Sequence, residues 1–457
     1  MRTTSFLIKR CVAGSGRRRT APAGGGRLVR SAGPGQDSGL LAALGYLAFS
    51  LFGLAVVLVS AEPLHRLWGG CAAVGYCCAA LTVLAPARLV PGHWRRDIAV
   101  AAAVSGALVV PLCWLAAAGR GMPEVGVVAH SAELLVAHGR PYQSAAQLGS
   151  DVYGYNPYLP GMTVFGLPRA LFGGGLMTDP RIWDAIAFLT AFAAALRIAG
   201  GSGGAALRRT AALAGTPLVA FPLAVSGNDL PVIGLICLGL ALAGQADPRS
   251  PAGQGGPALL TGHRALEGRM TPTDAVWAGV VVGAACTLKA TAWPALLVVG
   301  VLLAARDGRA AATRCVAAAA AVLAVVVGPF LLIQPADLAV NTIAFPLGLT
   351  AAHSPAASPL PGHLIAATGH AGRLAVITLL IVTMAVLGAR LASRPPRTSA
   401  RAAGYLALAL TALFTLAPAT RWGYFVYPAV IGCWLRLAGR APGRVSGRSS
   451  RPETMPG

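Results

Sequence analysis

The sequence predicts an all-α membrane protein, a polytopic bundle of about twelve transmembrane helices with both termini in the cytoplasm. Of its 457 residues, 55% are hydrophobic and 11% are charged, whereas a soluble globular protein carries about 25% charged residues. The hydrophobic residues fall into many separate runs of about 20 residues, the length that a helix needs to cross a hydrocarbon layer roughly 30 Å thick. These observations exclude a soluble enzyme.

The basic residues indicate the orientation of the chain. Its net charge of +22 comes from 37 basic and 15 acidic residues. A nucleic-acid partner would require a basic face or groove, but the basic residues stand in short clusters between apolar runs. The positive-inside rule predicts this distribution for cytoplasmic loops. We therefore expect the membrane, and no nucleic acid, as a partner.

The chain shows no sequence signal for a metal or a cofactor. Its nine cysteines are scattered, mostly inside apolar runs, and no two of them form a C-x-x-C pair. Such cysteines are typical of buried free thiols. A Gly-rich nucleotide-binding loop and a metal-ligand cluster are also missing from the sequence, so we expect neither a metal nor a cofactor.

The apolar runs divide the chain into a membrane domain and two tails. Residues 1–39 and 439–457 are expected to be basic cytoplasmic tails, the first of them disordered, and residues 40–438 one integral membrane domain. Crossings are predicted at about 40–60, 67–87, 98–118, 182–200, 210–226, 228–245, 275–289, 290–305, 315–333, 374–392, 402–418 and 424–438. This arrangement puts 29 of the 37 basic residues on the cytoplasmic side, which supports the orientation.

The same topology defines the loops. Residues 119–160 and 334–373 become long outer segments, and residues 246–274, rich in Gly, Pro and Ala, become a cytoplasmic spacer. Residues 158–177 are apolar enough to cross, but two prolines and Arg169 interrupt them. We expect this stretch to form a re-entrant or interfacial hairpin packed against other helices, where its backbone groups can be satisfied.

The first outer segment begins with a predicted surface helix from Glu124 to His138. At 100° per residue, its apolar residues form one stripe, and His130 and Glu133 lie on the other side. The stripe consists of Val125, Val128, Ala132, Leu135 and Val136. Such a helix lies in the plane of the membrane interface, and Gly139 is expected to end it.

Prolines and tyrosines follow the surface helix. They occur in Gly139-Arg-Pro-Tyr142 and in Tyr153-Gly-Tyr-Asn-Pro-Tyr-Leu-Pro160. Tyrosines at this position suit an interfacial belt. They are equally consistent with a sugar-binding platform, because an aromatic ring with a hydroxyl can stack on a pyranose and hydrogen-bond it.

Four short motifs stand in order on the expected outer side. They are Glu124-Val-x-Val127 followed by Gly139-x-Pro-Tyr142; Gly227-Asn-Asp-Leu-Pro231; Leu288-Lys289 before Trp293-Pro294; and Ala417-Pro418-x-x-Arg421-Trp422-Gly-Tyr424. Together they resemble glycosyltransferase family 87 and the related GT-C membrane transferases. The chain departs from the family pattern in having Glu124 where Asp is usual, and Tyr155-Asn-Pro157 where Tyr-Pro-Pro is typical.

The resemblance implies an inverting glycosyltransferase with its active site on the outer face of the plasma membrane. The donor would be a polyprenyl-phosphate sugar, commonly mannose, and the acceptor a lipid, glycan or protein. Glu124 would be the catalytic base, with Lys289 and Arg421 binding the donor's phosphate. Further substrate-binding residues would be Tyr142, Tyr155, Asp229 and His363.

Several of these residues also have a structural interpretation. Lys289 could extend its amine to lipid phosphates, Asp229 could cap a helix, and Glu124 could favour a helix N-terminus through the dipole. His363, like His353, could belong to a solvated loop, and Asp151 is the next candidate for the base.

Two other functions remain open at the level of the sequence. A transporter or flippase would require charges near the bilayer midplane, whereas most acids here fall near the outer ends of helices. The second alternative is a catalytically degenerate family member.

Overall fold

A computed structural model describes residues 34–244, 270–352 and 354–439 of the chain. Within these ranges the regular structure is helical, and strand pairing is limited to one isolated bridge between Ala357 and Thr420. The predicted all-α class is therefore confirmed. Most of the expected N-terminal and C-terminal tails and most of the spacer 246–274 lie outside the described residues, and the last residues of the expected N-terminal tail, from Pro34, belong to a helix.

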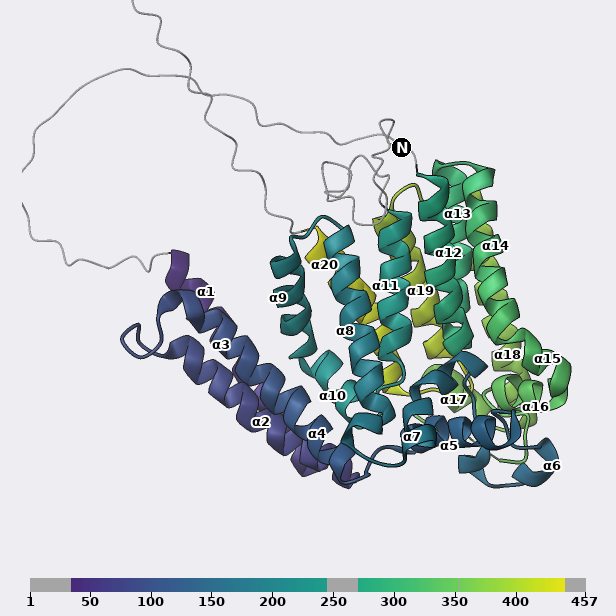
Figure 1. Cartoon of the computed structure of the whole chain (residues 1–457), viewed down its shortest axis with the longest axis horizontal. Helices are drawn as coiled ribbons and strands as arrows, with labels where there is room; N and C mark the ends of the chain where they lie inside the picture. The colour runs from purple at the N-terminus through teal and green to yellow at the C-terminus, as the bar shows by residue number, and fades with distance from the viewer. Residues whose placement is uncertain (1–33, 245–269, 353, 440–457) are drawn as a thin grey trace, which may run out of the picture.

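The first three membrane helices form a unit that leans against the other helices (Figure 1). Its elements are α1 (Pro34–Val59), α2 (Pro63–Leu84), and the continuous run of α3 (Gly92–Val104), η1 (Ser105–Val109) and α4 (Val110–Ala117). Gly75 of α2 meets Gly106, and a Cβ on Gly75 would lie 2.6 Å from the Gly106 Cα. Small residues thus let two apolar helices approach backbone to backbone.

The remaining long helices stand side by side around α11 (Leu230–Ala243), most of whose residues are buried. α11 packs against α8, α12, α13, α19 and α20. A helix that is apolar on all sides is expected at the centre of a bundle. The other elements of this part of the chain are α8 (Pro180–Ile198), α9 (Gly203–Ala214), α10 (Pro217–Val225), α12 (Pro272–Leu288), η6 (Ala290–Ala292), α13 (Trp293–Arg306), α14 (Arg309–Val326), α15 (Gly328–Ile333), α18 (His370–Ser393), α19 (Ser399–Leu416) and α20 (Val426–Ala438).

Each expected crossing coincides with a helix or with consecutive helices. The run 210–226 is divided between α9 and α10, because the chain turns before Pro217. By length and composition, six helices of the described chain can cross a membrane, and three apolar helices are shorter. The six are Gly39–Val59, Pro63–Leu84, Gly92–Ala117, Arg309–Val326, His370–Ser393 and Ser399–Leu416. The count of about twelve crossings stays a prediction.

Both long segments expected outside lie at one end of the bundle, the lower end in Figure 1. This end carries α5 (Pro123–His138), α6 (Ala145–Leu148), η2 (Val152–Gly154), α16 (Pro335–Ala339), η7 (Val340–Ala344) and α17 (Pro361–Ala366). The surface helix predicted from Glu124 to His138 is α5, and Gly139 ends it with φ 68°. Val125, Val128 and Ala132 of its predicted stripe are buried, but Val136 is exposed.

Residues 158–177 form no continuous helix. They fold into η3 (Pro160–Phe165), α7 (Leu167–Phe172) and η4 (Leu176–Thr178). Within the stretch, η3 packs against α5 and α12 and α7 packs against α5, and the Leu159 amide donates to the carbonyl of Leu288 at 3.0 Å. Its backbone therefore finds partners in protein, as a non-crossing hairpin requires.

We expect the end that carries α5 to face outward, because most basic residues fall in segments assigned to the other end. Single cysteines at Gln147 and Ala357, both exposed, should react with an impermeant maleimide in intact cells of a cysteine-free variant. If both positions react only after lysis, the orientation is reversed.

Candidate functional site

Glu124 and Arg421, 297 residues apart in sequence, form an ion pair at this end of the bundle. Pro123 starts α5 and places Glu124 in its first turn. Arg421 follows Ala417-Pro418, where α19 has ended and the chain turns toward η8 (Trp422–Phe425). Burial lowers the pKa of the Arg421 guanidinium, but the Glu124 carboxylate, together with Tyr424 and Tyr158, raises this pKa by more than burial lowers it. The pairing therefore keeps the arginine charged.

Lys289 and Asp229 form a second ion pair, with 2.5 Å between the ammonium and Oδ1. Lys289 has an extended backbone between α12 and η6, and its side chain is 11% exposed. Asp229 stands at the N-cap position of α11, but its side chain caps no amide. The ammonium also lies 4.7 Å from the centre of the Tyr158 ring, a cation–π arrangement.

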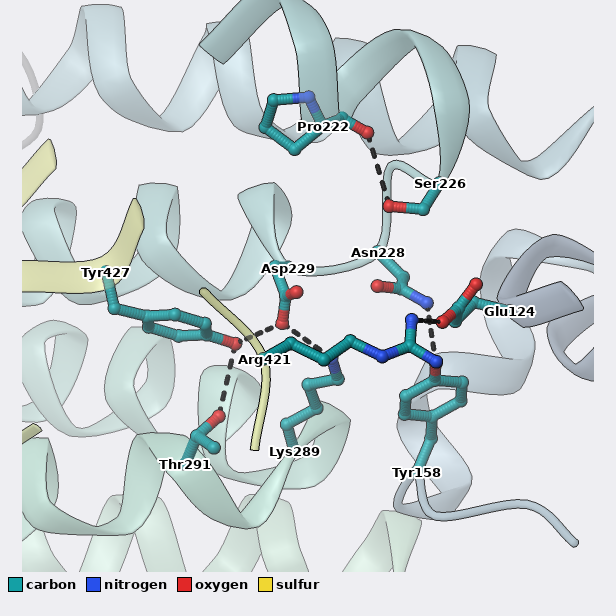
Figure 2. A network of polar contacts seen from close by, with 10 residues as sticks. All are labelled: Glu124, Tyr158, Pro222, Ser226, Asn228, Asp229, Lys289, Thr291, Arg421 and Tyr427. Carbon is teal, nitrogen blue, oxygen red and sulfur yellow. Dashed lines mark hydrogen bonds and ion pairs between the residues drawn. The ribbon is translucent and has the colours of Figure 1, made fainter. Parts of the chain in front are cut away.

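Hydroxyl and amide groups lie around the two pairs, and together they form the polar network of Figure 2. Tyr427 donates from its hydroxyl to Asp229 Oδ1 at 2.8 Å, and Thr291 donates to the Tyr427 hydroxyl at 3.1 Å. Asn228 donates from Nδ2 to the Tyr158 hydroxyl at 2.8 Å. Four separate parts of the chain thus bring two cations and two carboxylates together.

Arg181, on the first turn of α8, anchors the chain around this network. It is fully buried, and its guanidinium bonds both oxygens of Asp179 at 2.8 and 2.9 Å. It also donates to the carbonyls of Ala224 at 3.0 Å and Arg120 at 2.8 Å. Arg181 therefore fixes the end of α10, which precedes Asn228, and the segment that leads into α5 and to Glu124.

A further carboxylate, Asp184, is buried beside the turn that carries Asp229. A Cβ added to Gly227 would lie 2.5 Å from Asp184 Oδ2, and Gly227 has a φ of 83°. Both observations require glycine at this position of the turn.

Tyr142 and Tyr155 lie inside the first loop. Both are 4% exposed. The Tyr142 hydroxyl donates to the Tyr158 carbonyl at 2.8 Å, and the Tyr155 hydroxyl donates to the Gly149 carbonyl at 3.1 Å while its ring stacks on Phe345. Their rings therefore hold the loop in shape, and Tyr158 is the tyrosine of this segment that reaches the network.

His363 contacts the segment that leads to Arg421. Its Nδ1 is 3.0 Å from the Pro418 carbonyl. Asp151 is exposed, and it accepts from the Tyr153 amide at 3.0 Å, so it caps its own turn. His353 lies outside the described residues. Across the described ranges, His, Cys, Asp and Glu form no group that could hold a metal ion.

Sequence reasoning missed several of these residues. Tyr158 and Asn228 stand inside motifs noted in the sequence, but nothing there distinguished them from their neighbours. Arg181 and Asp184 had a usable signal, because charged residues at the start of an apolar run are costly unless paired or functional. Tyr427 had no signal, since its partner Asp229 is 198 residues away.

The helical membrane fold and this charged cluster define a class of protein, and comparison with known families identifies it. Residues 156–418 match the model of Glycosyltransferase family 87. The match covers more than half of the chain, so the chain belongs to this family and is a membrane glycosyltransferase. Asp229 and Lys289 lie inside the matched range, with Glu124 before it and Arg421 just after it. Neither the curated proteins nor the solved structures compared with the chain give a match.

Replacing Arg181 with Met should lower the stability of the protein by about 3–5 kcal/mol, because Asp179 would be left as a buried, unpaired charge. Thermal unfolding in detergent, followed by circular dichroism, measures the change. Arg140→Met, at an exposed position, is the control. Adding Asp179→Leu to Arg181→Met should recover part of the loss. Equal melting temperatures for Arg181→Met and the native protein would contradict the anchoring role.

Proposed function

We propose that this glycosyltransferase moves a sugar, with mannose favoured, from a polyprenyl-phosphate donor to a lipid, glycan or protein acceptor. The single observation that supports the proposal is the meeting of Glu124, Arg421, Lys289 and Asp229 at one end of an apolar bundle. A lipid-linked phosphate needs cations at the level where the hydrocarbon layer ends. It also needs an apolar surrounding for its tail, and the lipid-facing helices supply one.

In the proposed reaction, Lys289 and Arg421 bind the donor's phosphate. Ammonium and guanidinium groups form charge-assisted hydrogen bonds to phosphate oxygens, and a guanidinium can form two such bonds at once. The same bonds stabilise the negative charge that the phosphate gains as it leaves the sugar.

Glu124 acts in this proposal as the general base. The acceptor's hydroxyl oxygen attacks the anomeric carbon while the bond from that carbon to the phosphate oxygen breaks. The hydroxyl proton passes to Glu124, and the electron pair of the broken bond leaves with the phosphate. One displacement inverts the anomeric centre, so the reaction needs one base and a stabilised leaving group.

In the proposed reaction, the other predicted substrate-binding residues act by positioning the residues that bind the donor. Asp229 orients Lys289 through their ion pair, and His363 contacts the segment that carries Arg421. Tyr142 and Tyr155 shape the loop beneath Tyr158. We place the site on the outer face of the plasma membrane, because the cytoplasmic side is expected to carry most of the basic residues.

The decisive assay incubates purified protein with radiolabelled polyprenyl-phosphate mannose and membrane lipids. A transferase moves the label to an acceptor, whereas a flippase or a degenerate family member moves none. A matching donor that carries glucose tests the preference for mannose.

Replacing Lys289 with Met should raise the donor KM by about tenfold or more, because a charged hydrogen bond to the phosphate is lost. Transfer at varied donor concentration measures this, with each rate normalised to the amount of folded protein in the membrane. Lys289→Arg, which keeps the positive charge, should retain more activity than Lys289→Met. Unchanged kinetics in Lys289→Met would remove the lysine from the donor site.

Replacing Glu124 with Gln should lower kcat by about 10²- to 10⁴-fold, because the base is lost while the shape of the side chain is kept. Asp151→Asn is the matched control on the same loop, and it should transfer at the native rate. The reverse result, with Asp151→Asn inactive and Glu124→Gln active, would move the base to Asp151. Full activity in both variants would argue against a carboxylate base on this loop.

A further inference from the structure

Both cations of the network are occupied by carboxylates of the protein itself. Asp229 lies against the Lys289 ammonium, and Glu124 lies against the Arg421 guanidinium. The side chains of Asp229 and Glu124 are 17% and 18% exposed, and that of Arg421 is 32% exposed. The Lys289–Asp229 pair is therefore largely shielded from water, whereas Arg421 is partly open to it. Two positive and two negative charges leave the cluster near neutrality, which offers little attraction to an anion.

We propose, on the basis of the proposed function, that in the resting enzyme Glu124 and Asp229 bind the two cations that the donor's phosphate binds later. Binding of the phosphate then exchanges partners, so that Lys289 and Arg421 turn from the carboxylates to the phosphate oxygens. Glu124 is released as a base only when the donor is bound.

The two carboxylates differ in the hydrogen-bond partners that remain after the exchange. Asp229 retains the Tyr427 hydroxyl at 2.8 Å, which Thr291 supports in turn. The Oε2 oxygen of Glu124 is buried and has no hydrogen-bond partner, while its Oε1 is held by Arg421. When Arg421 turns to the phosphate, Glu124 has no remaining hydrogen-bond partner and can take a proton, whereas Asp229 still accepts from Tyr427.

The exchange couples donor binding to catalysis. The Arg421 guanidinium holds Oε1 of Glu124, so this oxygen accepts no hydroxyl proton until the guanidinium turns to the phosphate. With Glu124 restrained until the phosphate arrives, neither water nor the acceptor is activated at an empty site. Oε1, which Arg421 releases in the exchange, is the oxygen to which the acceptor hydroxyl would then donate.

The proposal makes a prediction that a simple loss of function does not make. Glu124→Gln removes the competing charge but keeps Arg421, so it should bind geranylgeranyl monophosphate more tightly by about three- to tenfold. The same variant should still fail to transfer sugar. Asp229→Asn should also bind the monophosphate more tightly, because Lys289 loses its competitor.

The measurement is microscale thermophoresis of the full chain in detergent, with geranylgeraniol as the ligand that lacks phosphate. Glu133→Gln is the matched control, because Glu133 lies on α5 with a side chain 53% exposed and outside the network. Its affinity for the monophosphate should equal that of the native protein. Melting temperatures confirm that each variant is folded.

Two kinds of failure are distinguishable. If the native protein binds the monophosphate and Lys289→Met does not, but Glu124→Gln and Asp229→Asn bind it no more tightly than the native protein, the exchange is wrong and the donor site stands. If the native protein and Lys289→Met bind monophosphate and alcohol alike, the proposed donor site is wrong, and the exchange fails with it.

Discussion

In an apolar bundle a charged side chain requires an opposite charge or water, and the Lys289–Asp229 pair meets this requirement where α11, α12 and α13 come together. Removing either partner would leave the other as a largely buried charge, which costs several kcal/mol. The pair therefore fixes the turn before α11 relative to the break between α12 and η6. The polar network of Tyr158, Asn228 and Tyr427 is assembled around that fixed point.

Arg181 extends the same constraint to the edge of the site. Its five donors are fixed in one plane, and they bind an aspartate and two carbonyl groups on separate segments. Each of those carbonyls ends a helix or starts a loop, where backbone groups lack partners within their own helix. One buried guanidinium thus replaces water at the junction of α4, α8 and α10, and it holds α5 where Glu124 can reach Arg421.

In this membrane transferase, the charges of Lys289 and Arg421 are neutralised by side chains of the protein. Carboxylates neutralise both cations, and the covering segments, α5 with η3 and the 417–421 turn, come from parts of the chain far apart in sequence. Two cations can lie this close together in a partly buried site because the groups that neutralise them belong to the protein. Their release by the donor would connect the stability of the resting state to the chemistry of the reaction.

The sequence by itself determined the helical membrane class and the position of α5, and it marked Glu124, Asp229, Lys289 and Arg421 as candidates, because hydrophobic runs, proline breaks and isolated charges are local signals. It could not determine that Glu124 pairs with Arg421 or Asp229 with Lys289, nor that Tyr142 and Tyr155 are buried while Tyr158 reaches the site. Those facts depend on which helix ends meet across 60 to 297 residues of chain. The packing of the folded bundle alone decides them, since one residue's shift along a helix turns its side chain by about 100°.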